Sequence, residues 1–330
     1  MAQHKILIIG VGSIGERHTR CFQSTNRAQI RICEPNETLR KTIAERYHLQ
    51  HVYASLDEAL VDPPTAAVVA TPAQTHIAIS QRLAEQGIHL LIEKPLSTSI
   101  EGTETLIQTV KKQKLTAAVA YVHRANPALA ALRQLVQSGR FGKPVEATFI
   151  TGQHFPTYRP AYREIYYTRH ETGGGAIQDA LTHILNAGEW ILGPLDRLMG
   201  DAQHLALPGV TVEDSVHVIA RHGPVMAAYT LNQHQAPNEL VFTIMCEQGT
   251  VRFEYPTRVR WMTNPATQQW QQQEYESLER DTVFTNQANA FIDAIEGKSP
   301  PLCTLEEGLH TLKLNLALLK EVQSPPWTVI

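Results

Sequence analysis

The sequence predicts an α/β protein in which a doubly wound parallel sheet is followed by a second domain with a large, mostly antiparallel sheet. Three observations support this prediction. Short apolar runs alternate with helical patterns over the first third of the chain, and a glycine-rich turn directly follows the first run. After about residue 123, strand-like runs follow one another with little helix between them. Alternating strands and helices favour parallel pairing, whereas consecutive strands favour antiparallel pairing.

The composition is that of an ordinary globular protein with enough chain for two domains. Of the 330 residues, 43% are hydrophobic and 18% are charged, and the formal net charge is −3. A long basic run is absent, which disfavours a nucleic-acid partner. No apolar stretch approaches the roughly 20 residues of a membrane helix. We therefore expect a soluble, cytoplasmic protein.

Cysteine and histidine usage gives little support for a metal site. The four cysteines are scattered and form no CxxC pair, which is typical of buried, reduced thiols. The fifteen histidines include no HExxH or comparable ligand spacing. We therefore predict no bound metal.

The expected elements of the first domain, residues 1–122, follow from apolar runs and helical periodicity. Strand-like runs cover residues 5–9, 29–33, 66–70, 89–92 and 116–121. Helical patterns cover residues 16–24, 37–47, 75–86 and 99–112. Right-handed crossovers place the carboxyl ends of all these strands at one edge of the sheet, where ligands bind.

The turn after the first strand has the glycine pattern of a dinucleotide-binding motif. Gly10, Gly12 and Gly15 form GxGxxG, and Ser13 and Ile14 lie between the last two glycines. In such a motif the first glycine permits a tight turn, the second admits a pyrophosphate, and the third lets helix and strand pack closely. The helix N-terminus offers N–H groups to the phosphates. The alternative is a glycine-rich turn that binds nothing.

An acidic residue at the end of the second strand bears on the choice of cofactor. Glu34 lies 19 positions after Gly15, where a carboxylate can accept hydrogen bonds from ribose hydroxyls. Such a carboxylate would repel the 2′-phosphate of NADP, and Arg40 is the nearest downstream cation that could offset the repulsion. We therefore predict NAD rather than NADP. The alternative role for Glu34 is capping of the next helix.

Two further strand ends are expected at the cofactor. Thr71 and Pro72 follow the strand at residues 66–70, and His76 either touches the cofactor or caps the next helix. The strand at residues 89–92 ends in Glu93 and Lys94.

Lys94 is the first candidate for catalysis. A lysine fixed at a strand end can donate a hydrogen bond to a substrate oxygen or relay a proton. Glu93 and Pro95 restrict its backbone. The alternative is a salt-bridged lysine without chemistry.

A second group of candidates follows three consecutive glycines, residues 173–175. Asp179 and His183 are four residues apart in a helical pattern over residues 178–192, so they share one helix face. The glycines allow close approach of the backbone to a ligand. An acid and an imidazole placed there can perform acid/base chemistry, in which Asp179 orients the ring and His183 moves the proton. Taken alone, such a pair is more often a surface feature.

These motifs together resemble the Gfo/Idh/MocA oxidoreductase family. The stretches GVGSIG with Glu34, ATPAQTH, IEKPLS and GGGAIQDALTH occur in the order and spacing of that family, and the resemblance covers essentially the whole chain. It implies a Rossmann domain followed by an α/β domain with a large antiparallel sheet. It also implies that Lys94, Asp179 and His183 are catalytic. In this scheme the histidine takes the hydroxyl proton, the lysine polarises the oxygen, and hydride passes to nicotinamide C4.

The second domain, residues 123–330, is expected to bind substrate and to form oligomers. Strand-like runs cover residues 145–151, 215–220, 225–231, 240–246, 250–253 and 259–262, and residues 268–273 are a solvated strand or loop. Helices are expected at residues 128–137 and 304–322, and the latter could pack back on the first domain. The 178–192 helix would cover one face of the sheet. We expect another subunit on the other face, giving a homodimer or homotetramer.

Residues 152–172 are rich in tyrosine and arginine and lead into the glycines. Tyrosines can stack on a sugar ring, and arginines can bind a carboxylate or phosphate. The alternative is that these side chains pack the loop or line a subunit interface. The predicted substrate-binding residues are Tyr121, Arg124, His154, Arg159, Tyr162 and Arg163.

The sequence thus predicts an NAD(H)-dependent dehydrogenase or reductase acting on a secondary alcohol or ketone. The expected substrate is a sugar, sugar acid, nucleotide sugar or cyclitol. One alternative is a glycoside-cleaving enzyme that retains its NAD and oxidises the substrate transiently. Another is a dinucleotide-sensing regulator without turnover, which the presence of all three catalytic candidates disfavours.

Overall fold

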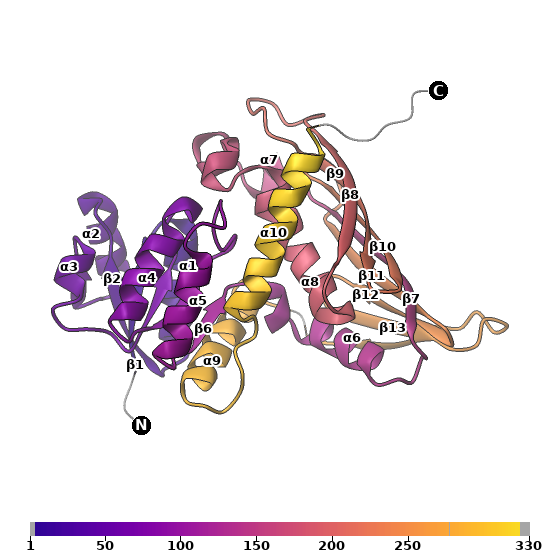
Figure 1. Ribbon diagram of the computed structural model, residues 1–330, viewed down its shortest axis with the longest axis horizontal. Helices are drawn as coiled ribbons and strands as arrows, with labels where there is room; N and C mark the ends of the chain where they lie inside the picture. The colour runs from indigo at the N-terminus through magenta and orange to yellow at the C-terminus, as the bar shows by residue number, and fades with distance from the viewer. Residues whose placement is uncertain (1–3, 277, 324–330) are drawn as a thin grey trace. The chain divides into compact units, whose positions relative to one another are not determined.

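The computed structural model describes residues 4–276 and 278–323, and the chain divides into two compact units (Figure 1). The first unit comprises Met1–Ala125 and Glu279–Leu309, and the second comprises Asn126–Leu278 and His310–Ile330. The C-terminal part of the chain therefore contributes to both units. The division of roles at residues 122 and 123 stays a prediction.

The first unit contains a six-stranded sheet in which all strands are parallel. The strand order is β3-β2-β1-β4-β5-β6, so the chain changes direction across the sheet between β1 and β4. In a doubly wound sheet, this switch point is where a ligand binds. The strands are β1 (His4–Ile9), β2 (Ala28–Cys33), β3 (His51–Tyr53), β4 (Ala66–Val69), β5 (His89–Ile92) and β6 (Ala117–Val119). The five expected strands are confirmed, and β3 was missed because it is short and only half-buried.

Helices cover both faces of this sheet. On one face, Phe22, Ile43 and Phe291 pack with the side chains of β1, β2 and β4. They belong to α1 (Ser13–Ser24), α2 (Glu37–Arg46) and α9 (Thr282–Ile295). The other face carries α4 (His76–Glu85) and α5 (Thr103–Lys112), which pack against each other. The short α3 (Leu56–Ala59) follows β3. Helix α9, which packs beside α1, was not expected from the sequence.

The second unit contains an eight-stranded, mostly antiparallel sheet, as predicted. Its order is β14-β13-β12-β11-β7-β10-β9-β8. Among the described strands of this second sheet, only β7 and β10 pair in parallel, and the other neighbours are antiparallel. The strands are β7 (Pro144–Gly152), β8 (Arg197–Gln203), β9 (Ser215–His222), β10 (Val225–Asn232), β11 (Glu239–Cys246), β12 (Gly249–Glu254), β13 (Arg258–Met262) and β14 (Gln271–Glu274). The polar β14 falls where a solvated strand or loop was expected, whereas β8 was not predicted.

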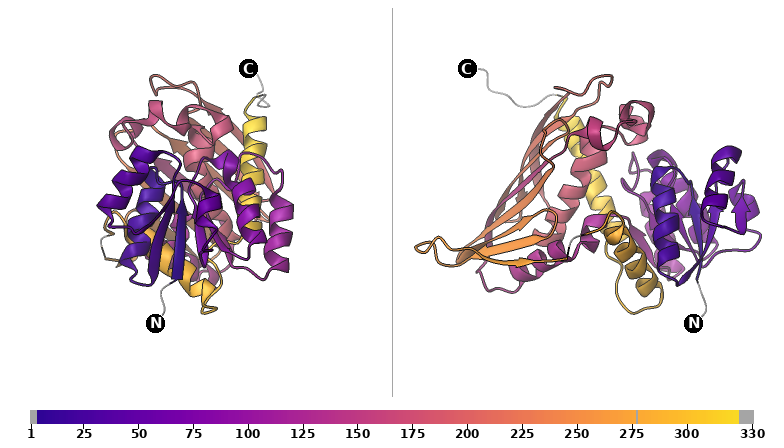
Figure 2. Two further views of the ribbon diagram at one scale, coloured as in Figure 1. Left: turned by 90° about the vertical axis from the view of Figure 1, so that its left-hand side faces the viewer. Right: turned by 180° about the vertical axis from the view of Figure 1, so that it is seen from behind.

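One face of this sheet is packed and the other is open, as the right-hand view of Figure 2 shows. The packed face is covered by α6 (Pro127–Gln137), α8 (Thr182–Leu192) and α10 (Leu305–Glu321). In its core, the ring of Phe149 stacks on Tyr229 with centroids 4.4 Å apart. On the open face, Ile219 is 56% exposed and Met226 is 55% exposed. None of the helices among the described residues is long and apolar enough to cross a membrane.

Phe149 and Ile150 are sequence neighbours on opposite faces of β7, so they offer a test of where the core lies. Phe149 is fully buried, whereas Ile150 is 39% exposed. We expect Phe149→Ala to lower the free energy of unfolding by about 3–5 kcal/mol, because it leaves a cavity beside Tyr229. The matched control Ile150→Ala should cost less than about 1 kcal/mol. Urea titration followed by circular dichroism measures both, and equal losses would contradict the assignment of faces.

Candidate functional site

The glycine turn after β1 is built as a dinucleotide motif requires. A Cβ at Gly15 would overlap the carbonyl oxygen of Gly10, so this close contact of helix and turn needs glycine. A Cβ at Gly12 would meet no atom within 4 Å, so the space beside it is open to a ligand. Gly12 is also the N-cap of α1 and supplies no side-chain cap, and Ser13 and Ile14 begin the helix. A pyrophosphate fits this open, positively polarised helix end.

Glu34 lies against the glycine turn at the end of β2. One carboxylate oxygen accepts from the backbone N–H of Val11 at 3.1 Å, and the other accepts from Asn36 at 3.0 Å. The capping side chain of α2 is Asn36, which accepts from Leu39, so Glu34 does not have this role. The guanidinium of Arg40 donates to the carbonyl oxygen of Glu34 at 2.6 Å. Arg40 is therefore engaged by the backbone.

Glu93 and Lys94 follow β5 at the carboxyl edge of the first sheet. Glu93 is 5% exposed, and its carboxylate contacts Nε2 of His18 at 2.7 Å and accepts from the backbone N–H of Lys94 at 3.0 Å. Burial raises the pKa of Glu93, but the hydrogen bond and charge of His18, together with Lys94, outweigh burial and leave that pKa below its usual value. A buried anion therefore lies directly beside the half-buried Lys94.

His76 connects two of the predicted cofactor segments. Its ring is buried, with Nε2 at 2.8 Å from the carbonyl oxygen of Thr71 and Nδ1 at 3.1 Å from that of Pro95. Burial lowers the pKa of His76. Pro72 is exposed beside this link. His76 thus joins the end of β4 to the segment that carries Lys94, and contact with the cofactor stays a prediction.

His123 is a further candidate site residue near Lys94, and the sequence analysis assigned it no role. It lies after β6 and is half-buried. Burial and the neighbouring Lys94 ammonium lower the pKa of His123 to about 4. At neutral pH this imidazole is therefore uncharged. The stretch around it, residues 121–127, also resembles the family, but that resemblance assigned no role to this histidine.

Two of the predicted substrate-binding residues are buried in the first unit. Tyr121 is 1% exposed and Arg124 is 3% exposed. Arg124 forms an ion pair with Glu307 at 2.6 Å and donates to the carbonyl oxygen of Leu302 at 2.9 Å. These contacts favour a structural role for Arg124, and a contact with substrate stays a prediction.

In the second unit the glycine run packs against the chain itself. A Cβ at Gly174 would overlap the carbonyl group of Tyr167. Gly175 has a φ of +83°, and a Cβ there would lie 2.5 Å from the carboxylate of Glu213. The sequence pattern suggested that these glycines admit a ligand. The structure gives another reason, which is that they bring residues 167–170 and Glu213 onto the start of the next helix.

That helix begins with a π-helical turn, not with the regular α-helix that the sequence predicted. The π turn covers Ile177–Leu181 and contains Asp179, and α8 then begins at Thr182. Such turns are rare and occur often at functional sites. Asp179 is 5% exposed and accepts a hydrogen bond from the hydroxyl of Tyr166 at 2.6 Å. Tyr166 thus fixes the carboxylate, and His183 is half-buried in the first turn of α8.

A second acid–imidazole pair lies beside the π turn and was also missed. Nε2 of His170 is 2.6 Å from the carboxylate of Glu213, which also accepts from the backbone N–H of Ile177 at 2.9 Å. The hydrogen bond with Glu213 raises the pKa of His170. Glu213 therefore holds the start of the π turn. In the sequence it is only an acid before a strand, so no signal marked it.

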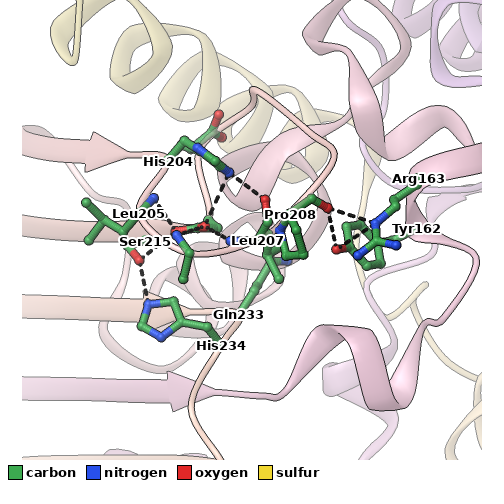
Figure 3. A network of polar contacts seen from close by, with 12 residues as sticks. Tyr162, Arg163, His204, Leu205, Leu207, Pro208, Ser215, Gln233 and His234 are labelled. Atoms are coloured by element: carbon green, nitrogen blue, oxygen red, sulfur yellow. Dashed lines mark hydrogen bonds and ion pairs between the residues drawn. The ribbon is translucent and has the colours of Figure 1, made fainter.

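The tyrosine- and arginine-rich segment is partly folded on itself. Tyr162 is 1% exposed, and its hydroxyl donates to the carbonyl oxygen of Pro208 at 2.7 Å. Nε of Arg163 reaches the same oxygen at 2.8 Å (Figure 3). His154 contacts the hydroxyl of Thr157 at 2.7 Å, and Arg159 is exposed. Packing of the loop is therefore the observed role of Tyr162, and substrate contacts of this segment stay predictions.

Residues 204–208, which contact Tyr162 and Arg163 through Pro208, are themselves held by a buried acid. Asp214 is fully buried and accepts from the backbone N–H groups of Leu205, Ala206 and Leu207. Ser215 donates to Asp214 and also contacts His234 at 3.0 Å. This network fixes residues 204–208, against which the tyrosine- and arginine-rich segment packs.

The fold and these residues define a dinucleotide-dependent oxidoreductase. Residues 4–121 match the family model of an oxidoreductase family with an NAD-binding Rossmann fold, and residues 129–252 match that of the GFO/IDH/MocA C-terminal domain. The chain therefore belongs to the Gfo/Idh/MocA oxidoreductase family, which confirms the resemblance found in the motifs. Its first unit contains an NAD-binding Rossmann domain.

Several proteins of known activity are similar to this chain. Levoglucosan dehydrogenase of Pseudarthrobacter phenanthrenivorans is 24% identical over an alignment of 288 positions that covers 76% of this chain and 73% of that protein. Inositol 2-dehydrogenase of Rhizobium meliloti is 23% identical over an alignment of 332 positions that covers 96% of each chain. A solved levoglucosan dehydrogenase in complex with NADH and levoglucosan has a TM-score of 0.89 at 17% identity, with 99% of each chain covered. This similarity confirms the predicted fold.

His123 predicts a pH dependence of stability. Its pKa is about 4 in the folded chain and 6.5 in the unfolded chain, so the unfolded chain binds the proton first as the pH falls. The free energy of unfolding should therefore decrease as the pH falls from 6.5 to 4, with a slope that corresponds to the uptake of roughly one proton on unfolding. In His123→Gln this part of the slope should be absent. Urea titrations at several pH values measure it, and identical slopes in the two proteins would refute the assignment. Replacement of the exposed His48 is the control.

Proposed function

We propose that this protein is an NAD(H)-dependent dehydrogenase or reductase that acts on a secondary alcohol or ketone of a sugar-like substrate. The observation that carries the proposal is the place of Lys94. It follows β5 at the carboxyl edge of the NAD-binding sheet, beside the buried carboxylate of Glu93. A fixed cation at this edge is suited to polarise an oxygen atom of a bound substrate.

In the proposed reaction, NAD and three residues of the chain have separate roles. When bound, NAD supplies the nicotinamide C4 atom that accepts or donates hydride. The ammonium of Lys94 donates a hydrogen bond to the reacting oxygen and stabilises negative charge there. The imidazole of His183 takes the hydroxyl proton during oxidation and returns it during reduction. Asp179 orients that imidazole, and its own orientation is fixed by the hydrogen bond from Tyr166.

The substrate class is supported by the names of the similar proteins and by the second unit. Levoglucosan and inositol, the compounds in those names, are ring compounds with several secondary hydroxyl groups. Tyr166 is 38% exposed, so the ring that holds Asp179 is also accessible to a sugar. The exposed Arg159 and Arg169 could bind an anionic group. A sugar acid or nucleotide sugar therefore stays among the candidates, beside neutral sugars and cyclitols.

The open face of the second sheet bears on the oligomeric state. The exposed apolar side chains of the open sheet face suit a homodimer or homotetramer, which light scattering of the purified protein would test. A cytoplasmic location stays a prediction from the sequence.

Two alternative functions were considered. If NAD stays bound to the protein and is not consumed during turnover, the glycoside-cleaving alternative is favoured. The catalytic candidates continue to disfavour a regulator without turnover.

Replacement of Lys94 and His183 tests the proposed chemistry. On the best substrate from a panel of sugars, sugar acids, cyclitols and nucleotide sugars, Lys94→Ala and His183→Ala should each lower kcat by about 10²–10⁴-fold. NADH absorbance gives the rates. The exposed Lys112 on α5 provides the control, since Lys112→Ala should leave kcat unchanged. Unchanged turnover in either active-site variant would refute the role assigned to that residue.

The carboxylate of Glu34 predicts the preference between the two nicotinamide cofactors. The wild-type protein should bind NAD at least roughly 10-fold more tightly than NADP, because a carboxylate beside the ribose repels a 2′-phosphate. Glu34→Gln should reduce this preference. Fluorescence titration measures both dissociation constants. Glu37→Gln, which changes an exposed acid three residues away, should leave the preference intact. Tighter binding of NADP by the wild-type protein would overturn the prediction.

A further inference from the structure

A buried histidine and a buried carboxylate connect the two motifs of the first unit. His18 lies on α1, one turn after Gly15, and Glu93 directly precedes Lys94. Nε2 of His18 is 2.7 Å from the Glu93 carboxylate, and the side chains are 1% and 6% exposed. The two residues are 75 positions apart in the sequence. One short contact thus links the helix of the glycine turn to the lysine segment.

The ring of His18 makes few other polar contacts. Among the described residues, its Nδ1 atom is buried and has no hydrogen-bond partner. The ring lies between Phe22 and Phe284, with centroids 6.2 and 5.9 Å away, so its orientation is fixed by aromatic packing. Because Nδ1 is unsatisfied, the contact of Nε2 with Glu93 is what offsets the free-energy cost of burying this imidazole.

Glu93 in turn fixes the backbone of Lys94. Its second oxygen accepts from the N–H of Lys94, while its own N–H donates to the carbonyl oxygen of Val69 in β4 at 2.9 Å. On the other side of the lysine, His76 contacts the carbonyl oxygen of Pro95. Buried side chains therefore hold the backbone N–H of Lys94 and, one residue later, the carbonyl group of Pro95.

We propose that His18 and Glu93 are a positioning pair that sets the place of Lys94 relative to the glycine turn. This inference rests on the proposed role of Lys94 in turnover. A buried polar pair is weak evidence for stability, because apolar residues of similar volume often stabilise a core equally well. A role in geometry explains why polar groups occupy this place. A lysine displaced by about 1 Å from its reacting oxygen can lose as much as 10²-fold in rate.

Four variants test the pair, with kcat, KM and the dissociation constant of NAD measured for each. Glutamine can place its amide nitrogen near the Nε2 position of histidine, whereas asparagine is too short. His18→Asn should therefore lower kcat by about 10-fold or more, and His18→Gln should restore most of the loss. Glu93→Gln should resemble His18→Asn. The double variant His18→Asn with Glu93→Gln should be no worse than the poorer single variant, because the two residues act as a unit.

The comparison must separate positioning from simple loss of stability. His222 in the second unit is a matched control, since it is 3% exposed and contacts the Tyr229 hydroxyl at 2.6 Å. His222→Asn should lower the free energy of unfolding without a change in kcat. In the His18 and Glu93 variants, kcat should fall while the NAD dissociation constant stays within about 3-fold of wild type.

Two results would overturn the inference. One is a folded His18→Asn or Glu93→Gln variant with wild-type kcat, and the other is equal impairment of the asparagine and glutamine variants at His18. Lys94→Ala distinguishes these failures from a failure of the proposed function. If Lys94→Ala turns over normally, both the proposed function and the positioning role are wrong. If it is inactive while Glu93→Gln keeps full activity, only the positioning role is wrong.

Discussion

The contact between Gly15 and the carbonyl group of Gly10 is the constraint on which the first unit depends. Because no side chain fits between them, α1 packs directly on the turn after β1. This packing brings the backbone N–H of Val11 to Glu34 and places His18 one turn further along the helix. From His18 the arrangement continues through Glu93 to Lys94. One helix therefore connects the glycine turn with the segment that carries Lys94, the residue proposed to bind the substrate oxygen.

In the second unit, glycines and a buried carboxylate fix the start of the helix that carries the candidate residues. Its glycines allow the chain to fold back on the start of a helix, and Glu213 then holds that start through the N–H of Ile177. The result is a π turn, in which Asp179 is buried and accepts a hydrogen bond from the hydroxyl of Tyr166. A π turn lacks regular α-helical hydrogen bonding, so neighbouring groups have to maintain it. The buried carboxylate of Glu213 and the glycine contacts supply that support.

The motifs and the order of elements were predictable because they depend on local spacing and composition. The strands of the Rossmann sheet other than β3, the GxGxxG turn and Glu34 belong to this group. Short or polar strands such as β3 and β8 lack an apolar run, so they were missed. The partners of site residues were also missed, because they are distant in the sequence. Arg124 was predicted to bind substrate, but its ion-pair partner, Glu307, lies 183 positions later.

The charges around Lys94 show why burial matters for the proposed chemistry. Glu93 remains ionised because His18 and Lys94 offset its burial, whereas burial and the Lys94 ammonium keep His123 neutral at neutral pH. Lys94 thus borders an anion that is almost closed to solvent and an imidazole that adds no positive charge. The same buried carboxylate that contacts His18 therefore also fixes the backbone of the lysine.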